Sequence, residues 1–299
     1  MKVKVILNPY ANRWGAKERM GEVEAALKEA ALSYDLAVTD GPGHGLRLAE
    51  TAVSEGYDVV VAAGGDGTVG EVANGLLRAS GDGPTVPLGV LPIGSANDFA
   101  VMTGIPRRVS EAVRIIAAGH TRQIDAGLVN GRYFINNSAC AMEPMVTLES
   151  MKIHRISGTL RYMVALVRAL ARLKAWQMQI VWDEGQYTGP VYLVSICNAG
   201  RSGGFMMAPQ AEVGDGKLDF VFAPEVPRRT VLAILLRLLR GTHIHHPQVE
   251  YGRITHLSLR SQPGTPVHAD GEIIGESLTH LEYRILPGKV TLITPPPAM

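Results

Sequence analysis

The 299-residue sequence contains only two cysteines, Cys140 and Cys197, and both lie in apolar segments. A chain of this size cannot be held together by one disulfide framework of two cysteines, so we expect buried thiols in a reducing compartment. An excess of charge is also absent, because 29 Lys and Arg residues face 28 Asp and Glu residues, which gives a net charge of +1. Proteins that bind nucleic acid generally carry a clear basic excess. We therefore expect no nucleic-acid partner.

Long apolar runs are missing as well. No stretch approaches the ~18 uninterrupted apolar residues of a membrane span. The first apolar run ends at Leu7 and is followed by Asn8-Pro9, so it is too short for the core of a signal peptide. These absences predict a cytoplasmic protein with no transmembrane segment.

The sequence has ample apolar material, with 46% hydrophobic residues. A single core rarely grows beyond ~250 residues, so this length predicts two domains. Residues 1–125 alternate strand and helix patterns, which predicts an α/β domain with a parallel sheet. In such sheets ligands bind at the carboxyl ends of the strands. The predicted strands are Val3–Leu7, Tyr34–Val38, Tyr57–Ala63 and Leu88–Leu91.

The pattern changes after about Asp125, where strand-like segments follow one another. Residues 126–299 are therefore predicted to form an antiparallel β-sandwich domain, and its last residues are free to pack back on the first domain. Asn130-Gly131 predicts a hairpin turn in this domain. Two helices are expected as insertions, at Thr159–Lys174 and Arg228–Arg240.

The segment Gly64-Gly65-Asp66-Gly67-Thr68 is the most informative motif. It follows a buried strand and opens a helix, where backbone N–H groups and the helix dipole favour a phosphate. Glycines let the backbone come close to such a ligand. The Gly-Lys-Ser/Thr of a P-loop is absent, and the dinucleotide fingerprint is matched only formally, after the third strand. The motif therefore predicts a different nucleotide loop with Asp66 at its centre.

Three further motifs follow in order: residues 92–100 (PIGSANDFA), residues 209–219 (PQAEVGDGKLD) and Asp270-Gly271-Glu272. Together with residues 64–75 (GGDGTVGEVANG) they resemble the diacylglycerol kinase catalytic family, which includes sphingosine kinases and bacterial lipid kinases. The resemblance covers nearly the whole chain. It implies an NAD-kinase-like nucleotide-binding domain followed by a β-sandwich, and an ATP-dependent kinase that phosphorylates a lipid hydroxyl such as that of diacylglycerol.

The resemblance also implies roles for single residues. Asp270 would be the general base, with Glu272 beside the nucleotide. Mg²⁺ would be held by Glu212, Asp215 and the carbonyl of Lys217, which are oxygen ligands of the type that magnesium prefers. The expected ATP contacts are Asn8, Pro9, Thr39, Gly64, Gly65, Asp66, Gly67, Thr68, Glu71, Ser95 and Asn97.

Two departures keep other functions open. Gly70 stands where the family usually has Asn, and residues 139–144 replace a glycine-rich turn that usually ends in Phe-Asp. The alternatives are an NAD kinase and a non-catalytic relative that binds lipid or nucleotide. Asp270-Gly271 is also a favoured hairpin turn. Asp270 can therefore be a turn residue, a catalytic base or both.

Two basic segments bear on the lipid substrate. No acid occurs between Ser150 and Trp182, and Arg161, Arg168 and Arg172 are expected on one helix face, opposite Met163, Leu166, Val167 and Leu170. Arg228–Arg240 contains four arginines and no acid. Each helix either packs on the sandwich or docks on an anionic membrane, where a lipid substrate resides. The second alternative predicts peripheral binding at the inner membrane face. A homodimer is a separate expectation.

Overall fold

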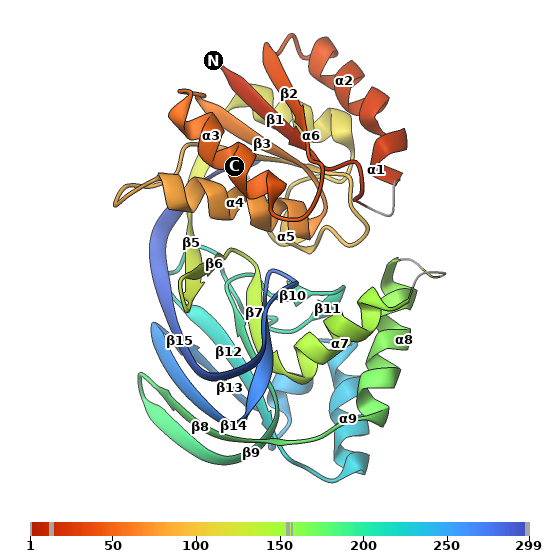
Figure 1. Cartoon of the computed structure of the whole chain (residues 1–299), viewed down its shortest axis with the longest axis vertical. Helices are drawn as coiled ribbons and strands as arrows, with labels where there is room; N and C mark the ends of the chain where they lie inside the picture. Colours follow the sequence, from red (N-terminus) through yellow and green to blue (C-terminus); the bar gives the residue numbers. More distant parts are fainter. Residues whose placement is uncertain (1, 12–14, 154–155, 157, 297–299) are drawn as a thin grey trace. The chain divides into compact units, whose positions relative to one another are not determined.

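The computed structural model describes residues 2–11, 15–153, 156 and 158–296. The chain forms two compact units (Figure 1): unit 1 contains the residues up to Asp125 and those from Gly288 onward, and unit 2 is Ala126–Pro287. Two strands, β5 (Thr121–Val129) and β15 (Glu272–Ile293), contribute residues to both units.

The sheet of unit 1 is built from β1 (Val3–Leu7), β2 (Tyr34–Val38), β3 (Val59–Gly64) and β4 (Leu88–Pro92). Their order is β4-β3-β1-β2, and every neighbouring pair runs parallel. The last residues of β15 also pair in parallel with β4. Every residue of β3 and β4 is buried, as expected for parallel strands that are covered on both faces.

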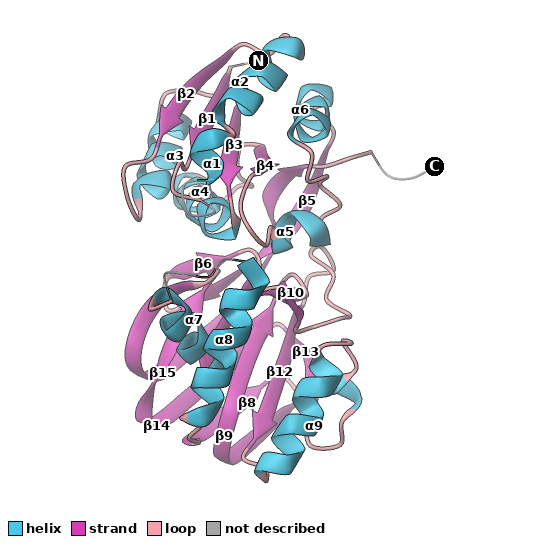
Figure 2. Ribbon diagram, turned by 90° about the vertical axis from the view of Figure 1, so that its right-hand side faces the viewer, coloured by secondary structure: helices cyan, strands magenta, loops and turns pink. Residues whose placement is uncertain are grey.

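Helices cover both faces of this sheet (Figure 2). The close packing of α3 against α4 depends on Gly75, where a Cβ atom would lie 2.3 Å from the carbonyl oxygen of Leu46. The helices of unit 1 are α1 (Gly15–Glu18), α2 (Met20–Glu29), α3 (His44–Ser54), α4 (Asp66–Ala79), α5 (Asp98–Met102) and α6 (Val109–Ala118).

The strands of unit 2 pair antiparallel, as predicted for the second part of the chain, and the residues from Gly288 onward belong to unit 1. Asn130 and Gly131 both have positive φ and join β5 to β6, which confirms the hairpin. The core contains Phe134, Phe220 and Tyr283. The other strands are β7 (Asn137–Ala141), β8 (Trp176–Trp182), β9 (Gly185–Cys197), β12 (Leu218–Pro224), β13 (Glu250–Ile254) and β14 (His256–Ala269), and β6 is Arg132–Phe134. A separate two-stranded sheet pairs β10 (Arg201–Ser202) with β11 (Phe205–Met206).

Unit 2 contains one helix more than we expected. Besides α8 (Gly158–Ala171) and α9 (Arg228–Leu238), the structure has α7 (Met142–Met151), and a short 3₁₀ helix spans His243–His245. The sequence predicts no helix at α7, where residues 139–144 stand out only as a departure from the family pattern, and Pro144 lies in the first turn of α7. Proline is tolerated in the first turn of a helix, where its missing N–H has no partner to lose.

The exposed face of α8 differs from the expected one. Ala165 and Ala169 are buried, whereas Met163 and Val167 are exposed and Arg161 is half-buried. The expected division into an arginine face and an apolar packed face is therefore wrong in part. The smallest side chains, and not the largest, form the buried stripe, so larger apolar groups remain at the surface.

Candidate functional site

The carboxyl ends of the four parallel strands bring the expected nucleotide contacts of unit 1 to one edge. Asn8 directly follows β1, and its N–H donates to the Ala63 carbonyl over 2.9 Å. Thr39 follows β2 and donates to the Leu7 carbonyl over 2.9 Å. The loop after β4 begins with Ile93, whose N–H donates to the Gly64 carbonyl over 3.0 Å. These bonds tie each loop to the end of a neighbouring strand.

Two glycine loops touch at this edge. A Cβ atom at Gly94 would lie 2.3 Å from the Cα of Gly65. Asn97, with φ of 53°, fixes the second loop from inside: its Oδ1 accepts from the Gly94 N–H and its Nδ2 donates to the Gly94 carbonyl, both over 3.0 Å. Ser95, which lies between Gly94 and Asn97 in this loop, is exposed. Asn97 therefore shapes the loop that it was expected to line.

Asp66 is the first residue of α4, and its Oδ1 accepts a hydrogen bond of 2.9 Å from the N–H of Phe99 in α5. The neighbouring Thr68 accepts from Nδ2 of Asn8 over 3.0 Å. Gly67 is exposed, and apart from its chain neighbours and the backbone of its own helix no heavy atom lies within 4 Å of the place that a Cβ would take there. Open space therefore adjoins the start of α4, where the first backbone N–H groups of a helix lack intrahelical partners.

Glu71 connects α4 to the loop before α3. Its two carboxylate oxygens accept from the N–H groups of Gly43 and Gly45, each over 2.9 Å. Those N–H groups lie at the start of α3, so the carboxylate satisfies helix-terminal donors and opposes the positive end of the dipole. A pocket of about 350 Å³ lies beside this loop and is lined by Asn8, Tyr10, Glu71 and residues 40–42.

We expect Gly94→Ala to destabilise the protein by ~1–3 kcal/mol, because the added methyl group meets backbone atoms of Gly65 that cannot move aside. Gly67→Ala is the matched control. It adds the same methyl group in open space inside a helix, so the free energy of unfolding should stay the same or rise slightly. Urea unfolding of both variants measures the difference. Equal stability of the two would disprove the contact between the loops.

In unit 2, Asp270 is both part of a turn and an inward-pointing acid. Asp270 and Gly271 have φ values of 49° and 80° and join Ala269 to Glu272, as in a two-residue hairpin. The carboxylate accepts backbone N–H donors from three successive residues: Ile135 at 3.0 Å, Asn136 at 2.9 Å and Asn137 at 3.1 Å. The turn therefore holds this carboxylate in one orientation.

Burial raises the pKa of Asp270 to about 6, although the three backbone donors and the nearby His268 act to lower it. A carboxylate with such a pKa is ionised at neutral pH and is more basic than an exposed one. This combination is the one that suits a general base.

Sequence reasoning missed a buried pair beside this turn. His268, 1% exposed, accepts at Nδ1 from the Gly271 N–H over 3.3 Å, and its Nε2 lies 3.3 Å from Oε1 of Glu143. Glu143 also accepts from Asn137 over 2.8 Å and from Ser202 over 2.7 Å. Burial acts to raise the pKa of Glu143, but these partners outweigh it and hold the pKa below its usual value. The one local signal was the position of His268, two residues before Asp270. Nothing local pointed to Glu143, which is distant in the sequence.

Glu272 begins β15, is exposed, and forms an ion pair with Arg132 of β6. Its carboxylate is therefore held by an arginine from within unit 2. This ion pair gives Glu272 a structural role and does not test the expected contact of Glu272 with a nucleotide.

The expected magnesium ligands lie in the segment before β12. Oδ1 of Asp215 accepts from the Lys217 N–H over 3.0 Å, and Oδ2 lies 3.4 Å from Arg253. Burial raises the pKa of nearby Asp219, and the charges of Asp215 and Glu212 raise it further. This excess of negative charge and the oxygen donors fit a divalent cation. The described residues contain no cluster of three or more His, Cys, Asp or Glu side chains arranged for a metal, so the Lys217 carbonyl or water would have to complete the ligand set.

Among the described residues, no helix has the length and apolar character needed to cross a membrane.

Comparison with known proteins covers both units. Residues 2–129 match the family model of the diacylglycerol kinase catalytic domain. Residues 139–294 match the model of the YegS C-terminal NAD kinase beta sandwich-like domain.

Curated relatives cover most of the chain. A diacylglycerol kinase of Staphylococcus aureus (strain bovine RF122 / ET3-1) is 30% identical over 92% of this chain and 87% of its own length. A diacylglycerol kinase of Staphylococcus saprophyticus is 29% identical over 92% and 90%.

Solved structures show the same fold. A diacylglycerol kinase from Bacillus anthracis superposes with a TM-score of 0.74 at 21% identity, covering 100% of this chain and 98% of that one. A yeast NADH kinase complexed with NADH reaches a TM-score of 0.53 at 11% identity, covering 99% and 84%. The NAD-kinase-like architecture is thereby confirmed as a likeness of fold.

Proposed function

The chain belongs to the diacylglycerol kinase family, and we propose that it transfers the γ-phosphate of ATP to the hydroxyl of diacylglycerol or a closely related lipid. Family membership makes the chain an ATP-dependent lipid kinase, and the choice of acceptor is the proposal. The observation that carries it is the similarity to curated diacylglycerol kinases, at 30% identity over 92% of this chain. The carboxylate of Asp270, held by three backbone donors and with a pKa of about 6, would serve as the base for that hydroxyl.

We propose that the phosphates of ATP bind at the start of α4. Backbone N–H groups of residues 65–68 and the positive end of the helix dipole favour the triphosphate there. The open space beside Gly67 and the adjoining 350 Å³ pocket give room for the nucleotide. Glu71 and Asn97 act through the loops that they hold, and Asp66 adds a negative charge suited to the cation that accompanies ATP. Magnesium supplies neutralisation of phosphate charge in such reactions.

Asp270 would accept the proton of the lipid hydroxyl. The hydroxyl oxygen then forms a bond to the γ-phosphorus, the bond between that phosphorus and the bridging oxygen breaks, and ADP leaves. Catalysis of this kind is mainly positioning and charge stabilisation, with a carboxylate as proton acceptor. His268 and Glu143 would act as positioning residues, because His268 binds the Gly271 N–H of the same turn.

The raised pKa of Asp270 predicts how kcat/KM depends on pH. The base must be ionised, so kcat/KM should be constant above pH 7 and fall tenfold per pH unit below about pH 6. An acid with its ordinary pKa would place this fall near pH 4. The pH profile of kcat/KM, measured with near-UV circular dichroism at each pH as the folding control, checks the position of the fall.

Two adjoining apolar cavities in unit 2 support a lipid acceptor. Each has a volume of about 60 Å³, and they share lining from α7, β9 and α9. Glu143 and Ser202 line one of them and give it a polar side. We propose that the acyl region enters between α9 and the sheet. The lining side chains common to both cavities are Met142, Leu193, Met207, Leu235 and Leu238.

The helices α8 and α9 lie on the same side of the strands of unit 2 (Figure 2), and we propose that they dock on an anionic membrane at its inner face. Leu232, Leu236 and Leu239 are 60%, 59% and 59% exposed. Exposed arginines flank these leucines, and α9 contains no acid. Arg172 has a smaller part in this surface than we expected, because it pairs with Glu149 at 3.1 Å.

Reversing Arg229, Arg237 and Arg240 to Glu should weaken binding to phosphatidylglycerol vesicles by on the order of 10²-fold or more, since each basic residue near such a surface contributes ~1 kcal/mol. Co-sedimentation at low salt measures this. Arg122→Glu, an exposed arginine of unit 1, is the control and should bind almost normally. Equal binding by the triple variant would leave α9 without a role at the membrane. A separate sedimentation-velocity run on the protein alone distinguishes the homodimer from a monomer.

The acceptor is tested by offering diacylglycerol, a sphingoid base and NAD separately, each with radiolabelled ATP. We expect transfer to diacylglycerol. NAD is included because the yeast NADH kinase shares the fold. Transfer to NAD alone would disprove the lipid acceptor, and transfer to none of these would favour a non-catalytic relative.

A further inference from the structure

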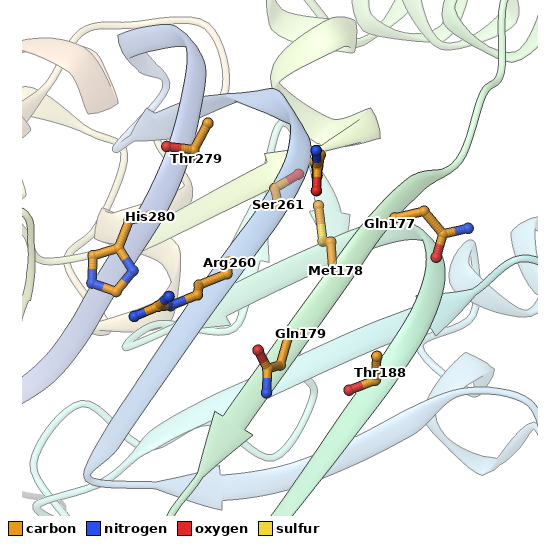
Figure 3. Close-up of a pocket in the computed structure, with 9 residues that line it drawn as sticks. Gln177, Met178, Gln179, Thr188, Arg260, Ser261, Thr279 and His280 are labelled. Atoms are coloured by element: carbon orange, nitrogen blue, oxygen red, sulfur yellow. The ribbon is translucent and has the colours of Figure 1, made fainter.

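A polar hollow of about 730 Å³ lies on one face of the unit 2 sheet, away from the apolar cavities described above. It is formed where β9, β8, β14 and β15 pair side by side. Figure 3 shows its side chains, with Arg260 lying between His280 and Gln179. No residue of this hollow belongs to the sites assigned so far.

Strand register places these side chains in rows. Gln179 pairs with Thr188 of β9 on one side and with Arg260 of β14 on the other, and Arg260 pairs with His280 of β15. Directly opposed side chains lie ~5 Å apart. Four polar side chains thus form a continuous row across four strands.

A second row lies two residues further along. Gln177 pairs with Gln262, and because side chains alternate between faces, both point to the same side as Gln179 and Arg260. The two rows together present amide and hydroxyl groups that can donate and accept hydrogen bonds.

An irregularity in the sheet opens the hollow. The pairing of β14 with β15 stops at Arg260 opposite His280 and resumes at Thr265 opposite Leu278. Residues 261–264 therefore oppose only Thr279. Extra residues on one strand bend a sheet and re-aim its side chains, and such bulges are frequent near functional sites.

Arg260 has no acidic partner among the residues that line the hollow. Within the described part of the chain Arg260 forms no ion pair. Glu282, two residues beyond His280 on β15, lies 3.0 Å from His280 and 2.8 Å from His256, and no ion pair joins it to Arg260 among the described residues. A guanidinium without a carboxylate is a ready partner for a phosphate, which it binds through two parallel N–H donors.

An ordinary solvated sheet face is the simplest alternative. Such a face usually carries interspersed charges of both signs, whereas this hollow has one arginine and one histidine among neutral amides and hydroxyls. Hydroxyl-bearing ligands are recognised by side chains of that neutral kind, and the arginine adds a site for one anion.

We propose that this hollow binds a phosphorylated polyol, with Arg260 on the phosphate and the glutamines on the hydroxyl groups. The site is separate from the proposed nucleotide and lipid sites, and the proposal does not rest on them. The ligand is either a soluble phosphorylated polyol or the headgroup of a glycerophospholipid, since both present the same chemistry.

Calorimetric titration of the full chain with glycerol 3-phosphate tests the site. We expect saturable binding at one site, about 10- to 100-fold weaker in Arg260→Gln, because a charge-assisted bidentate contact is lost. Arg284→Gln is the matched control: Arg284 is an exposed arginine of β15 outside the hollow, and its removal should leave the affinity unchanged. Glycerol should bind far more weakly than its phosphate. Thermal melting shows that both variants are folded.

A second titration distinguishes a soluble phosphorylated polyol from the headgroup of a glycerophospholipid. Dihexanoyl phosphatidylglycerol, kept below its critical micelle concentration, presents the headgroup without a membrane. Loss of both ligands in Arg260→Gln supports a lipid headgroup, and loss of glycerol 3-phosphate alone supports a soluble ligand. Absence of saturable binding to the unmodified protein, or equal weakening by the Arg260 and Arg284 substitutions, would overturn the proposal.

Discussion

Asp270→Asn should lower turnover by ~10²–10⁴-fold, the usual contribution of general acid–base catalysis. An amide cannot take the proton of the lipid hydroxyl, whereas Asn-Gly suits the same type of hairpin turn as Asp-Gly. The affinity for ATP should change little, because the groups proposed to bind it belong to unit 1. Steady-state kinetics and calorimetric titration with ATP separate these two effects.

The contacts of Asp270 add a condition to this experiment. One carboxylate oxygen accepts from Ile135 and the other from Asn136 and Asn137. In the variant an NH₂ group must face one of these N–H donors, which costs ~1–3 kcal/mol of stability. Removing a buried charge offsets part of that cost. A thermal melt must therefore show that the variant is folded at the assay temperature. A folded variant that retains most of its turnover would remove Asp270 from the mechanism.

Asp66→Asn should reduce ATP-dependent turnover by on the order of 10²-fold, because one charge that serves the transferring phosphate is lost, while Asp66→Ala should lose turnover and also stability. Asparagine retains an oxygen at the position that accepts from the Phe99 N–H, and it loses only the charge. Alanine also removes this acceptor at the first turn of α5, which typically costs ~0.5–2 kcal/mol.

Comparing Asp66→Asn with Asp66→Ala separates the role of the Asp66 charge in ATP binding from its role as the hydrogen-bond acceptor of Phe99. Urea unfolding should place Asp66→Asn near the unmodified protein and Asp66→Ala below it, and calorimetry with Mg-ATP should show weakened binding in both. Normal turnover in Asp66→Asn would mean that the aspartate serves only to hold α5. Equal stability of the two variants would show that the bond to Phe99 contributes nothing.

The sequence predicted the loops at the carboxyl ends of the unit 1 strands because the signals for these loops are local. A buried strand that runs into Gly64-Gly65-Asp66-Gly67-Thr68 predicts a loop at the carboxyl end of that strand, and α4 begins at Asp66 as this motif implies. What these side chains contact was not predictable. Asp66 binds a residue 33 positions away, and Glu71 binds residues 26 and 28 positions away. Such partners depend on how the loops fold over one another, and no periodicity encodes that.

The surroundings of Asp270 were harder to predict for the same reason. The Asp270-Gly271 turn is local and was expected, but the three donors to its carboxylate come from residues more than 130 positions earlier. The segment at residues 139–144 stood out only as a departure from the family pattern. Glu143, at the start of the unexpected helix α7, contacts His268 and so reaches the turn that carries Asp270.

The most direct test of the lipid kinase mechanism is the transfer of label from [γ-³²P]ATP to diacylglycerol in mixed micelles, followed by extraction of the product into chloroform. The unmodified protein should produce a labelled lipid phosphomonoester in amounts equal to the ADP formed, and Asp270→Asn should produce ~10²–10⁴-fold less at saturating ATP. Label that appears only as inorganic phosphate or only on NAD, or equal amounts of lipid product from both proteins, would contradict this mechanism.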